Sequence, residues 1–279
     1  MSRIKARNSL DRAASARAAA PAIDFRPALL AALLVFGLAA SPASAEKTRI
    51  DRWRAEIAKI DERQQAGKTE RAQRQARKLW REMRERGWRE PKLPALLAEV
   101  AAQLAIAEIN SGGDRRLAHW TWHTALLLDS EAAQDRDWSR YGKAGNILLE
   151  LPLRSAGVAP AGSRALAPPF PSGGRLERPR PRDEFDQPVL PLNRAARHER
   201  RITRPGLEVI IHADGSVSQP VIVYGQHAKP TVLITVLELV FGSAPYVPGK
   251  LDGEAVDVIY KIDIEKFNFR RWEEMVVYQ

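Results

Sequence analysis

Residues 207–267 carry the pattern that most constrains the fold, because strand-like runs alternate there with one helical stretch in a fixed order. The runs 207–212 and 217–224 flank the pair Asp214-Gly215, and an Asp-Gly pair between two β-rich runs is a strong hairpin signal. We therefore expect an antiparallel hairpin that turns at Asp214 and Gly215.

A helix and a third strand are expected after this hairpin. Pro230 begins a run whose apolar residues recur at helical spacing, namely Leu233, Val236, Leu237, Val240 and Phe241. Residues 255–265 then alternate at the period of a strand. One face of this strand has Val256, Val258, Tyr260, Ile262 and Ile264, and the other has Asp257, Lys261, Asp263 and Glu265, with Ile259 as the exception.

A proline sets the expected strand order. Pro220 has no backbone N–H to donate to a sheet ladder, so the second strand is best placed at an edge. The first strand then lies in the centre and the third at the opposite edge, where its backbone groups can accept an extended peptide. The expected partner-binding residues are Val256, Asp257, Val258, Ile259, Tyr260, Lys261, Ile262, Asp263 and Ile264. The alternative is that this strand pairs with its own tail or with a second copy, as a homodimer.

The order of these elements resembles the C-terminal domain of the TonB family, the energy transducers of Gram-negative envelopes. The resemblance rests on four segments, which are Gly206-Leu207-Glu208-Val209, Ala213-Asp214-Gly215-Ser216-Val217, Phe241 with Pro245, and Gly253-Glu254-Ala255-Val256. It implies a small α+β domain over residues 207–279 that binds an extended peptide of an outer-membrane transporter by strand addition.

Residues 46–151 are expected to form helices joined by glycine turns. Apolar residues at helical spacing mark four helices, with breaks at Gly67, Gly87 and Gly112-Gly113, and Asp114 is a good N-cap for the fourth. The third and fourth helices resemble a tetratricopeptide repeat in Leu104, Ala105, Ala118 and Ala125. We expect stacked helical hairpins that bury a shared face and bind a second protein.

Residues 152–206 hold ten prolines and eleven arginines but only two aromatic residues. Because so few apolar groups cannot offset the entropy of ordering the chain, we expect a disordered, semi-extended linker. A basic linker can also lie along anionic lipid, which offers a route to membrane association. Binding of nucleic acid is not expected, since stacking aromatics are scarce.

Residues 1–45 have the three parts of a secretory signal, with a basic start, an apolar run at 28–40, and small residues that include Ala43 and Ala45. A membrane-spanning helix needs about 20 apolar residues, which is more than this run provides. We expect cleavage after Ala45 and a periplasmic protein. The alternative is an uncleaved anchor in the inner membrane, with the rest of the chain facing the periplasm.

No catalytic, cofactor or metal site is expected. His119 and His123 lie one helical turn apart, but the glutamate of an H-E-x-x-H motif and a third ligand are missing. The chain has no cysteine, and neither a Ser/His/Asp order nor a glycine-rich phosphate loop stands out. His212 is expected to face solvent from its strand, and Asp214 to serve its turn.

These patterns predict an α+β protein whose last part is a three-stranded antiparallel sheet with one helix. The predicted parts are a signal at 1–45, a tetratricopeptide-like domain at 46–151, a linker at 152–206 and a TonB-like domain at 207–279. The expected function is that of a non-catalytic periplasmic adaptor, in envelope transport or energy transduction, which binds a periplasmic or outer-membrane protein. The alternative is a membrane-anchored TonB-type transducer for outer-membrane transporters.

Overall fold

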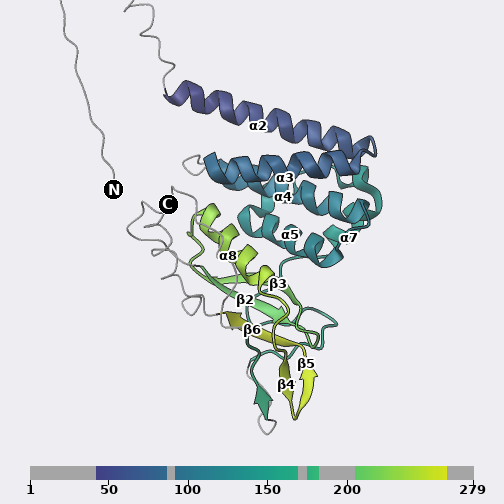
Figure 1. The fold of residues 1–279 in the computed structure, drawn as a ribbon, viewed down its shortest axis with the longest axis vertical. Helices are drawn as coiled ribbons and strands as arrows, with labels where there is room; N and C mark the ends of the chain where they lie inside the picture. The colour runs from purple at the N-terminus through teal and green to yellow at the C-terminus, as the bar shows by residue number, and fades with distance from the viewer. Residues whose placement is uncertain (1–41, 87–91, 169–174, 182–204, 263–279) are drawn as a thin grey trace, which may run out of the picture. The chain divides into compact units, whose positions relative to one another are not determined.

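The computed structural model describes residues 42–86, 92–168, 175–181 and 205–262. Residues Glu46–Gln279 form one compact unit, in which helices come first along the chain and two small antiparallel sheets follow (Figure 1). The expected α+β fold class is confirmed.

The helices of the first part begin and end close to the predicted positions. They are α2 (Pro42–Gln65), α3 (Thr69–Arg86), α4 (Leu93–Asn110), α5 (Arg115–Leu128), α6 (Ser130–Gln134), the 3-10 helix η1 (Trp138–Tyr141) and α7 (Gly142–Leu149). Gly67 and Gly112 have φ angles of 68° and 69°, a left-handed conformation that favours glycine, so the chain turns where the sequence predicts. The Asp114 side chain accepts a hydrogen bond from the N–H of Arg116 at 2.8 Å, which confirms the predicted N-cap of α5.

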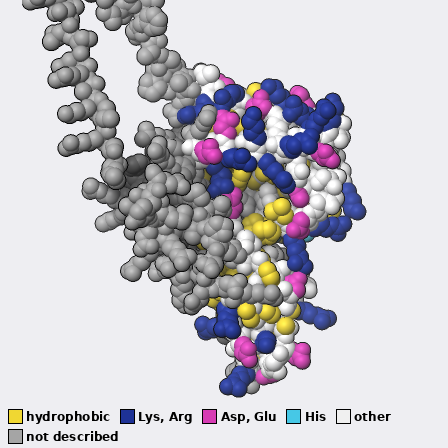
Figure 2. All heavy atoms as spheres, in the orientation of Figure 1, with side chains coloured by type: hydrophobic (Ala, Val, Ile, Leu, Met, Phe, Trp, Pro, Cys, Tyr) yellow, Lys and Arg dark blue, Asp and Glu magenta, His cyan; other side chains and the backbone are white. Residues whose placement is uncertain are grey.

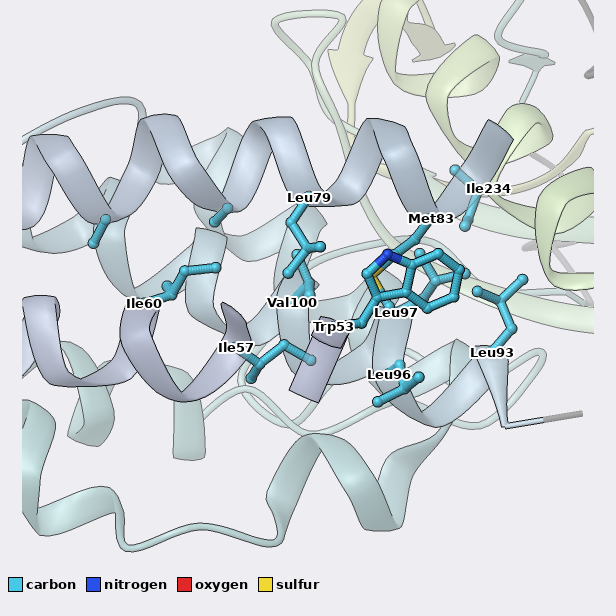
Figure 3. Close-up of a cluster of buried hydrophobic side chains, with 12 residues drawn as sticks. Trp53, Ile57, Ile60, Leu79, Met83, Leu93, Leu96, Leu97, Val100 and Ile234 are labelled. Carbon is cyan, nitrogen blue, oxygen red and sulfur yellow. The ribbon is translucent and has the colours of Figure 1, made fainter. Parts of the chain in front are cut away.

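The predicted apolar faces of these helices meet in a buried cluster. Its members are Trp53, Ile57, Ile60, Ala72, Ala76, Leu79, Met83, Leu93, Leu96, Leu97, Val100 and Ile234. Ile234 comes from α8 (Pro230–Gly242), far along the chain, and lies beside Met83 at one end of the cluster (Figure 3). α4 is long and apolar enough to cross a membrane, but 61% of it is buried inside the fold, as in the core helix of a globular unit.

The outward faces of α2 and α3 are charged. Lys and Arg side chains, with Asp and Glu between them, cover this end of the molecule in Figure 2. Arg74, Lys78 and Arg81 of α3 are exposed, and Ala76, Leu79 and Met83 of the same helix are buried. The two faces explain why a helix so rich in charge still packs on its neighbours.

The main sheet has the strand order β3-β2-β6, as predicted. β2 (Gly206–Ile211) lies in the centre, and β3 (Val217–Tyr224) and β6 (Val258–Ile262) pair with it antiparallel on either side. Pro220 falls on the edge strand β3, where the register with β2 is irregular. The β2–β3 hairpin turns at Asp214 and Gly215, which is also confirmed.

The predicted third strand is divided in two. β5 (Glu254–Val256) belongs to a second sheet of order β1-β4-β5, together with β1 (Leu176–Glu177) and β4 (Gly249–Leu251). β6 begins after Asp257, whose carboxylate accepts a hydrogen bond from the N–H of Ala213 at 2.8 Å. The single strand over 255–265 is therefore a wrong prediction, since this contact interrupts it, and Asp263 and Ile264 lie outside the described residues.

One face of the main sheet packs on α8 and α5. The buried cluster there contains Trp120, Leu207, Val209, Ile211, Val217, Leu233, Val236, Leu237, Val240, Tyr246 and Ile262. The ring of Trp120 lies 5.3 Å from that of Phe241, and the hydroxyl of Tyr246 donates to the carbonyl of Val240 at 2.9 Å. The predicted apolar face of α8 thus packs on the sheet.

The opposite face of the main sheet is covered by residues 152–168, which the sequence assigns to a linker. Ala165 packs there against Ile210 and Ile259. Because both faces are covered, all six residues of β2 are buried.

The prediction of a disordered linker is wrong for residues 152–168 and 175–181. Composition cannot reveal that a few specific contacts, an ion pair and a strand bridge among them, hold this arginine-rich segment on the sheet. Residues 169–174 and 182–204 lie outside the described residues.

The buried clusters also cross the predicted domain boundaries. Trp120, from the predicted domain 46–151, lies in the core of the sheet, and Ile234, from the predicted domain 207–279, lies in the core of the helices. The structure therefore differs from the division into 46–151, 152–206 and 207–279, because helices and sheet share their cores in one unit.

Candidate functional site

The outer edge of β6 is the predicted partner-binding site, and another segment of the chain already pairs with part of it. The N–H of Leu166 donates to the carbonyl of Asp257 at 2.8 Å, and the N–H of Ile259 donates to the carbonyl of Leu166 at 2.9 Å. Leu166 and Val258 thereby form a parallel bridge on the side of β6 away from β2. This edge accepts an extended chain in β geometry.

Proline limits how far this pairing continues. The next bond of a parallel ladder would need a backbone N–H at Pro168, and proline has none. Alternate residues of a strand direct their backbone groups to the same side, so Lys261 directs its N–H and C=O outward, as Ile259 does. Among the described residues, no backbone hydrogen bond occupies this outer side of Lys261.

The predicted edge residues have unequal surroundings. Val258, Ile259 and Ile262 are buried against the two faces of the sheet, with exposed fractions of 1%, 2% and 2%. Lys261 is exposed, with its ammonium 5.0 Å from the ring centre of Tyr224. Their side chains are therefore largely committed to the fold, and a partner would meet mainly backbone.

The hairpin turn is fixed by close backbone packing. Gly215 has a φ of 81°, and a Cβ atom added to it would lie 2.3 Å from the carbonyl oxygen of Tyr246. Its own carbonyl accepts a hydrogen bond from the N–H of Tyr246 at 2.8 Å. Only glycine fits a left-handed position with a backbone this close.

Asp214 joins the turn to the helices. Its carboxylate lies 2.7 Å from the guanidinium of Arg116 on α5. Hydrogen bonds from the side chain and backbone of Ser216, together with the charge of Arg116, lower the pKa of Asp214 to about 2. The carboxylate therefore stays ionised at neutral pH.

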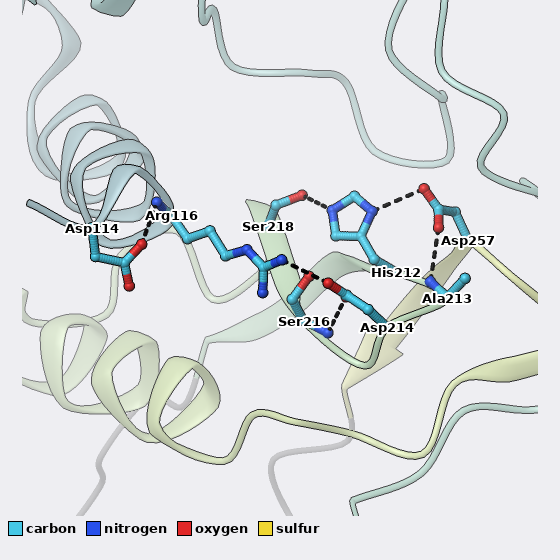
Figure 4. A network of polar contacts seen from close by, with 8 residues as sticks. All are labelled: Asp114, Arg116, His212, Ala213, Asp214, Ser216, Ser218 and Asp257. Carbon is cyan, nitrogen blue, oxygen red and sulfur yellow. Dashed lines mark hydrogen bonds and ion pairs between the residues drawn. The ribbon is translucent and has the colours of Figure 1, made fainter. Parts of the chain in front are cut away.

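His212 lies between a serine and an aspartate (Figure 4). Its Nε2 lies 2.8 Å from the hydroxyl of Ser218, and its Nδ1 lies 2.8 Å from Oδ2 of Asp257. The other oxygen of Asp257 accepts the N–H of Ala213 at 2.8 Å, so the carboxylate is fixed on both sides. The His212 side chain is 33% exposed, and the strand break at Asp257 brings this carboxylate to the hairpin, so the residue that was predicted to face solvent also holds two polar contacts.

The partners define the tautomer of this histidine. An ionised carboxylate only accepts hydrogen bonds, so Nδ1 of His212 carries the proton that points at Asp257. Nε2 is then the acceptor, and the hydroxyl of Ser218 donates to it. The three groups are arranged as a nucleophile, a base and a group that orients the base.

The three residues Ser218, His212 and Asp257 are called the relay below. A pocket of about 200 Å³ opens beside it. Its walls come from α5, from the segment after α7, from the turn between β2 and β3, and from β3, and they include Arg116, His119, Trp120, Leu151, Val217 and Ser218. Burial lowers the pKa of His123 to about 4, so its imidazole is neutral at pH 7.

The remaining predicted positions stay untested. Within the described ranges, no group of His, Asp and Glu side chains could hold a metal ion. Ala43 and Ala45 fall in the first turns of α2, which begins at Pro42, and cleavage after Ala45 stays a prediction.

Sequence reasoning missed the relay because its members come from different elements. Ser218 and His212 are six residues apart across a hairpin, where Ser218 lies opposite Ile210 and His212 reaches it as a diagonal neighbour. That pairing was readable in the sequence, but Asp257 lies 45 residues from His212 and no local pattern connects them. The buried contact between Arg154 and Glu208, which are 54 residues apart, could not be predicted from a local sequence pattern either.

No family model, no curated protein and no solved structure matches this chain.

Proposed function

We propose that this protein is a periplasmic adaptor that binds an extended peptide of another envelope protein by strand addition to the outer edge of β6. The observation that supports this most is the bridge between Leu166 and Val258, because it places a chain segment in the geometry that a partner peptide would adopt. The resemblance of residues 207–267 to the TonB C-terminal domain points to the same mode of binding.

The part of the edge that no described residue pairs with begins where Pro168 ends the pairing. A partner peptide there would bond to the carbonyl of Ile259 and to the backbone of Lys261. Binding through main-chain groups requires no catalysis. It is also possible while the side chains of β6 are buried in the fold, because the partner contacts the backbone.

The helices supply the second proposed surface. We infer that the stacked hairpins of α2 to α5 resemble tetratricopeptide repeats and bind a second, acidic partner. Exposed Arg74, Lys78 and Arg81 on α3 support an acidic partner, since opposite charge steers association.

A backbone substitution tests the strand-addition proposal in the full chain. Lys261→Pro removes an N–H that points away from β2, so the internal ladder keeps its hydrogen bonds. Lys261→Ala removes the side chain and keeps that N–H. We expect envelope proteins captured by the wild type and by Lys261→Ala to be lost with Lys261→Pro.

Crosslinking locates the contact independently of the variants. A photoreactive amino acid placed at Lys261 is expected to crosslink the captured protein, whereas one at exposed Lys143 on α7 is not. Retention of the same protein by Lys261→Pro would contradict strand addition at this edge.

The N-terminus of the purified protein separates the adaptor from the alternative, a membrane-anchored TonB-type transducer. Glu46 as the first residue excludes the anchor, because residues 28–40 would then be removed. An intact N-terminus in the membrane fraction would favour the transducer.

A further inference from the structure

The side chains of Ser218, His212 and Asp257 make none of the backbone contacts of strand addition, and they lie beside a pocket of their own. We propose that this relay is a hydrolytic site, in which Ser218 is the nucleophile and His212 the general base for the cleavage of short-chain acyl esters. This activity goes beyond the adaptor function and does not depend on it.

The first argument is the order of the contacts. The serine hydroxyl meets one ring nitrogen of His212 at 2.8 Å, and a carboxylate meets the other at 2.8 Å, so the base is both in reach of the nucleophile and oriented. Asp257 is itself held by the N–H of Ala213 at 2.8 Å. It is a positioning residue, since it acts through the histidine.

The second argument is the pocket. Ser218 and His212 both line the cavity of about 200 Å³, so a small molecule in it would lie beside the two residues. Trp120, Leu151 and Val217 give the cavity an apolar part. Since the cavity is smaller than those that hold drug-sized ligands, about 300 Å³ or more, it suits a short acyl chain.

The third argument is a set of polar groups in the same walls that lack partners. The indole Nε1 of Trp120 can only donate, and it is buried without a hydrogen-bond partner among the described residues. His119 Nε2 is also buried without a hydrogen-bond partner among the described residues and donates in one of its two tautomers, and Arg116, which pairs with Asp214, lines the same pocket. A reacting carbonyl oxygen that becomes negative would be stabilised by such donors.

The backbone after the nucleophile is also unusual. Gln219 has a φ of 50°, a left-handed conformation that non-glycine residues rarely adopt. The side-chain oxygen of this residue is buried without a hydrogen-bond partner among the described residues. Such conformations persist only where the surrounding structure enforces them, and they cluster at functional sites.

The reaction is balanced without a cofactor. Oγ of Ser218 forms a bond to the acyl carbon while its proton passes to Nε2 of His212, and the alcohol leaves with that proton. Water then attacks the acyl-serine and gives its proton to His212, and the acid departs as Ser218 recovers the proton.

A fluorophosphonate probe tests the nucleophile, because a serine activated in this way displaces fluoride and keeps the phosphonyl group. We expect one label per chain of the full protein, located on Ser218 by tandem mass spectrometry, and turnover of p-nitrophenyl acetate. The label is located in the wild type, so this test does not depend on the folding of a variant.

Variants then test the relay. His212→Gln is expected to slow labelling on the order of 100-fold, and Asp257→Asn roughly tenfold or more. Ser139→Ala is the matched control, because the Ser139 hydroxyl donates to Asp137 at 2.5 Å with no histidine beside it, and labelling should not change.

Several results would overturn the proposal. They are an unlabelled wild type, a label on another residue, and a rate that His212→Gln does not change while thermal unfolding shows that the variant is folded. Any of them would leave the three side chains as a structural link between the hairpin and β6.

Discussion

Nη1 of Arg154 lies 2.5 Å from Oε1 of Glu208, and the two side chains are only 3% and 11% exposed. The pair joins the segment that precedes the sheet to its central strand. The N–H of Gly157 donates to the same carboxylate oxygen at 2.8 Å, and Nε of Arg154 donates to the carbonyl of Gln219 at 3.1 Å. The arginine thus holds β2 and β3 from the covering side.

Removal of one partner should destabilise the protein strongly. Arg154→Ala leaves the Glu208 carboxylate buried without its counter-charge, and we expect a loss of about 3–5 kcal/mol in the free energy of unfolding. Urea denaturation measures this loss. Arg164→Ala, at an exposed position of the same segment, should change it by about 0.5 kcal/mol or less. An equal effect of the two variants would show that the buried pair does not hold the segment.

Gly215→Ala should be more costly than the same change at another left-handed glycine. At Gly215 the new Cβ meets the Tyr246 carbonyl at 2.3 Å, whereas at Gly162, with a φ of 77°, it meets nothing within 4 Å. We expect about 1 kcal/mol for Gly162→Ala, from the backbone conformation alone, and at least twice as much for Gly215→Ala. Thermal unfolding compares them, and equal losses would refute the close contact.

Helices and sheet should unfold together, because they share buried clusters. Ile234→Ala removes a side chain of α8 from the helical core, and we expect about 2–5 kcal/mol of destabilisation. Circular dichroism and tryptophan fluorescence should then follow one coincident transition. Val158→Ala, at a residue 55% exposed, is the control. Two separated transitions would support the predicted division into separate domains. A 207–279 fragment that folds by itself would support it as well.

Stability should fall between pH 6.5 and pH 4 because of His123. Burial lowers the pKa of His123 from 6.5 to about 4, so the unfolded chain binds a proton in this range and the folded protein does not. Stability therefore rises with pH across this window, by about 3 kcal/mol in total, and is constant above it for this group. Chemical denaturation at several pH values measures the slope.

The contribution of His123 is isolated by substitution. His123→Gln should flatten most of the slope, and His227→Gln, at an exposed position, should leave it unchanged. A slope that survives in His123→Gln would assign the pH dependence to other groups, such as His119, whose pKa is lowered by burial.

Local patterns predicted the elements well, because each depends on neighbours in the sequence. Gly67, Gly112 and Asp114 stand at the observed turns and cap, and Pro220 placed β3 at an edge of the sheet. What covers each face was not predictable, since Trp120 enters the sheet core from a distant helix. The same holds for the relay, since Asp257 reaches His212 only through the break between β5 and β6.

The anchoring of α8 in the helical core determines how the fold would carry tension. A peptide pulled along the outer edge of β6 would load the ladder between β6 and β2 in shear, with several hydrogen bonds resisting together. α8 packs on that sheet and also places Ile234 among the helices. A force that enters at Lys261 would thus reach α3 and α4 through packed side chains, without passing through a flexible linker.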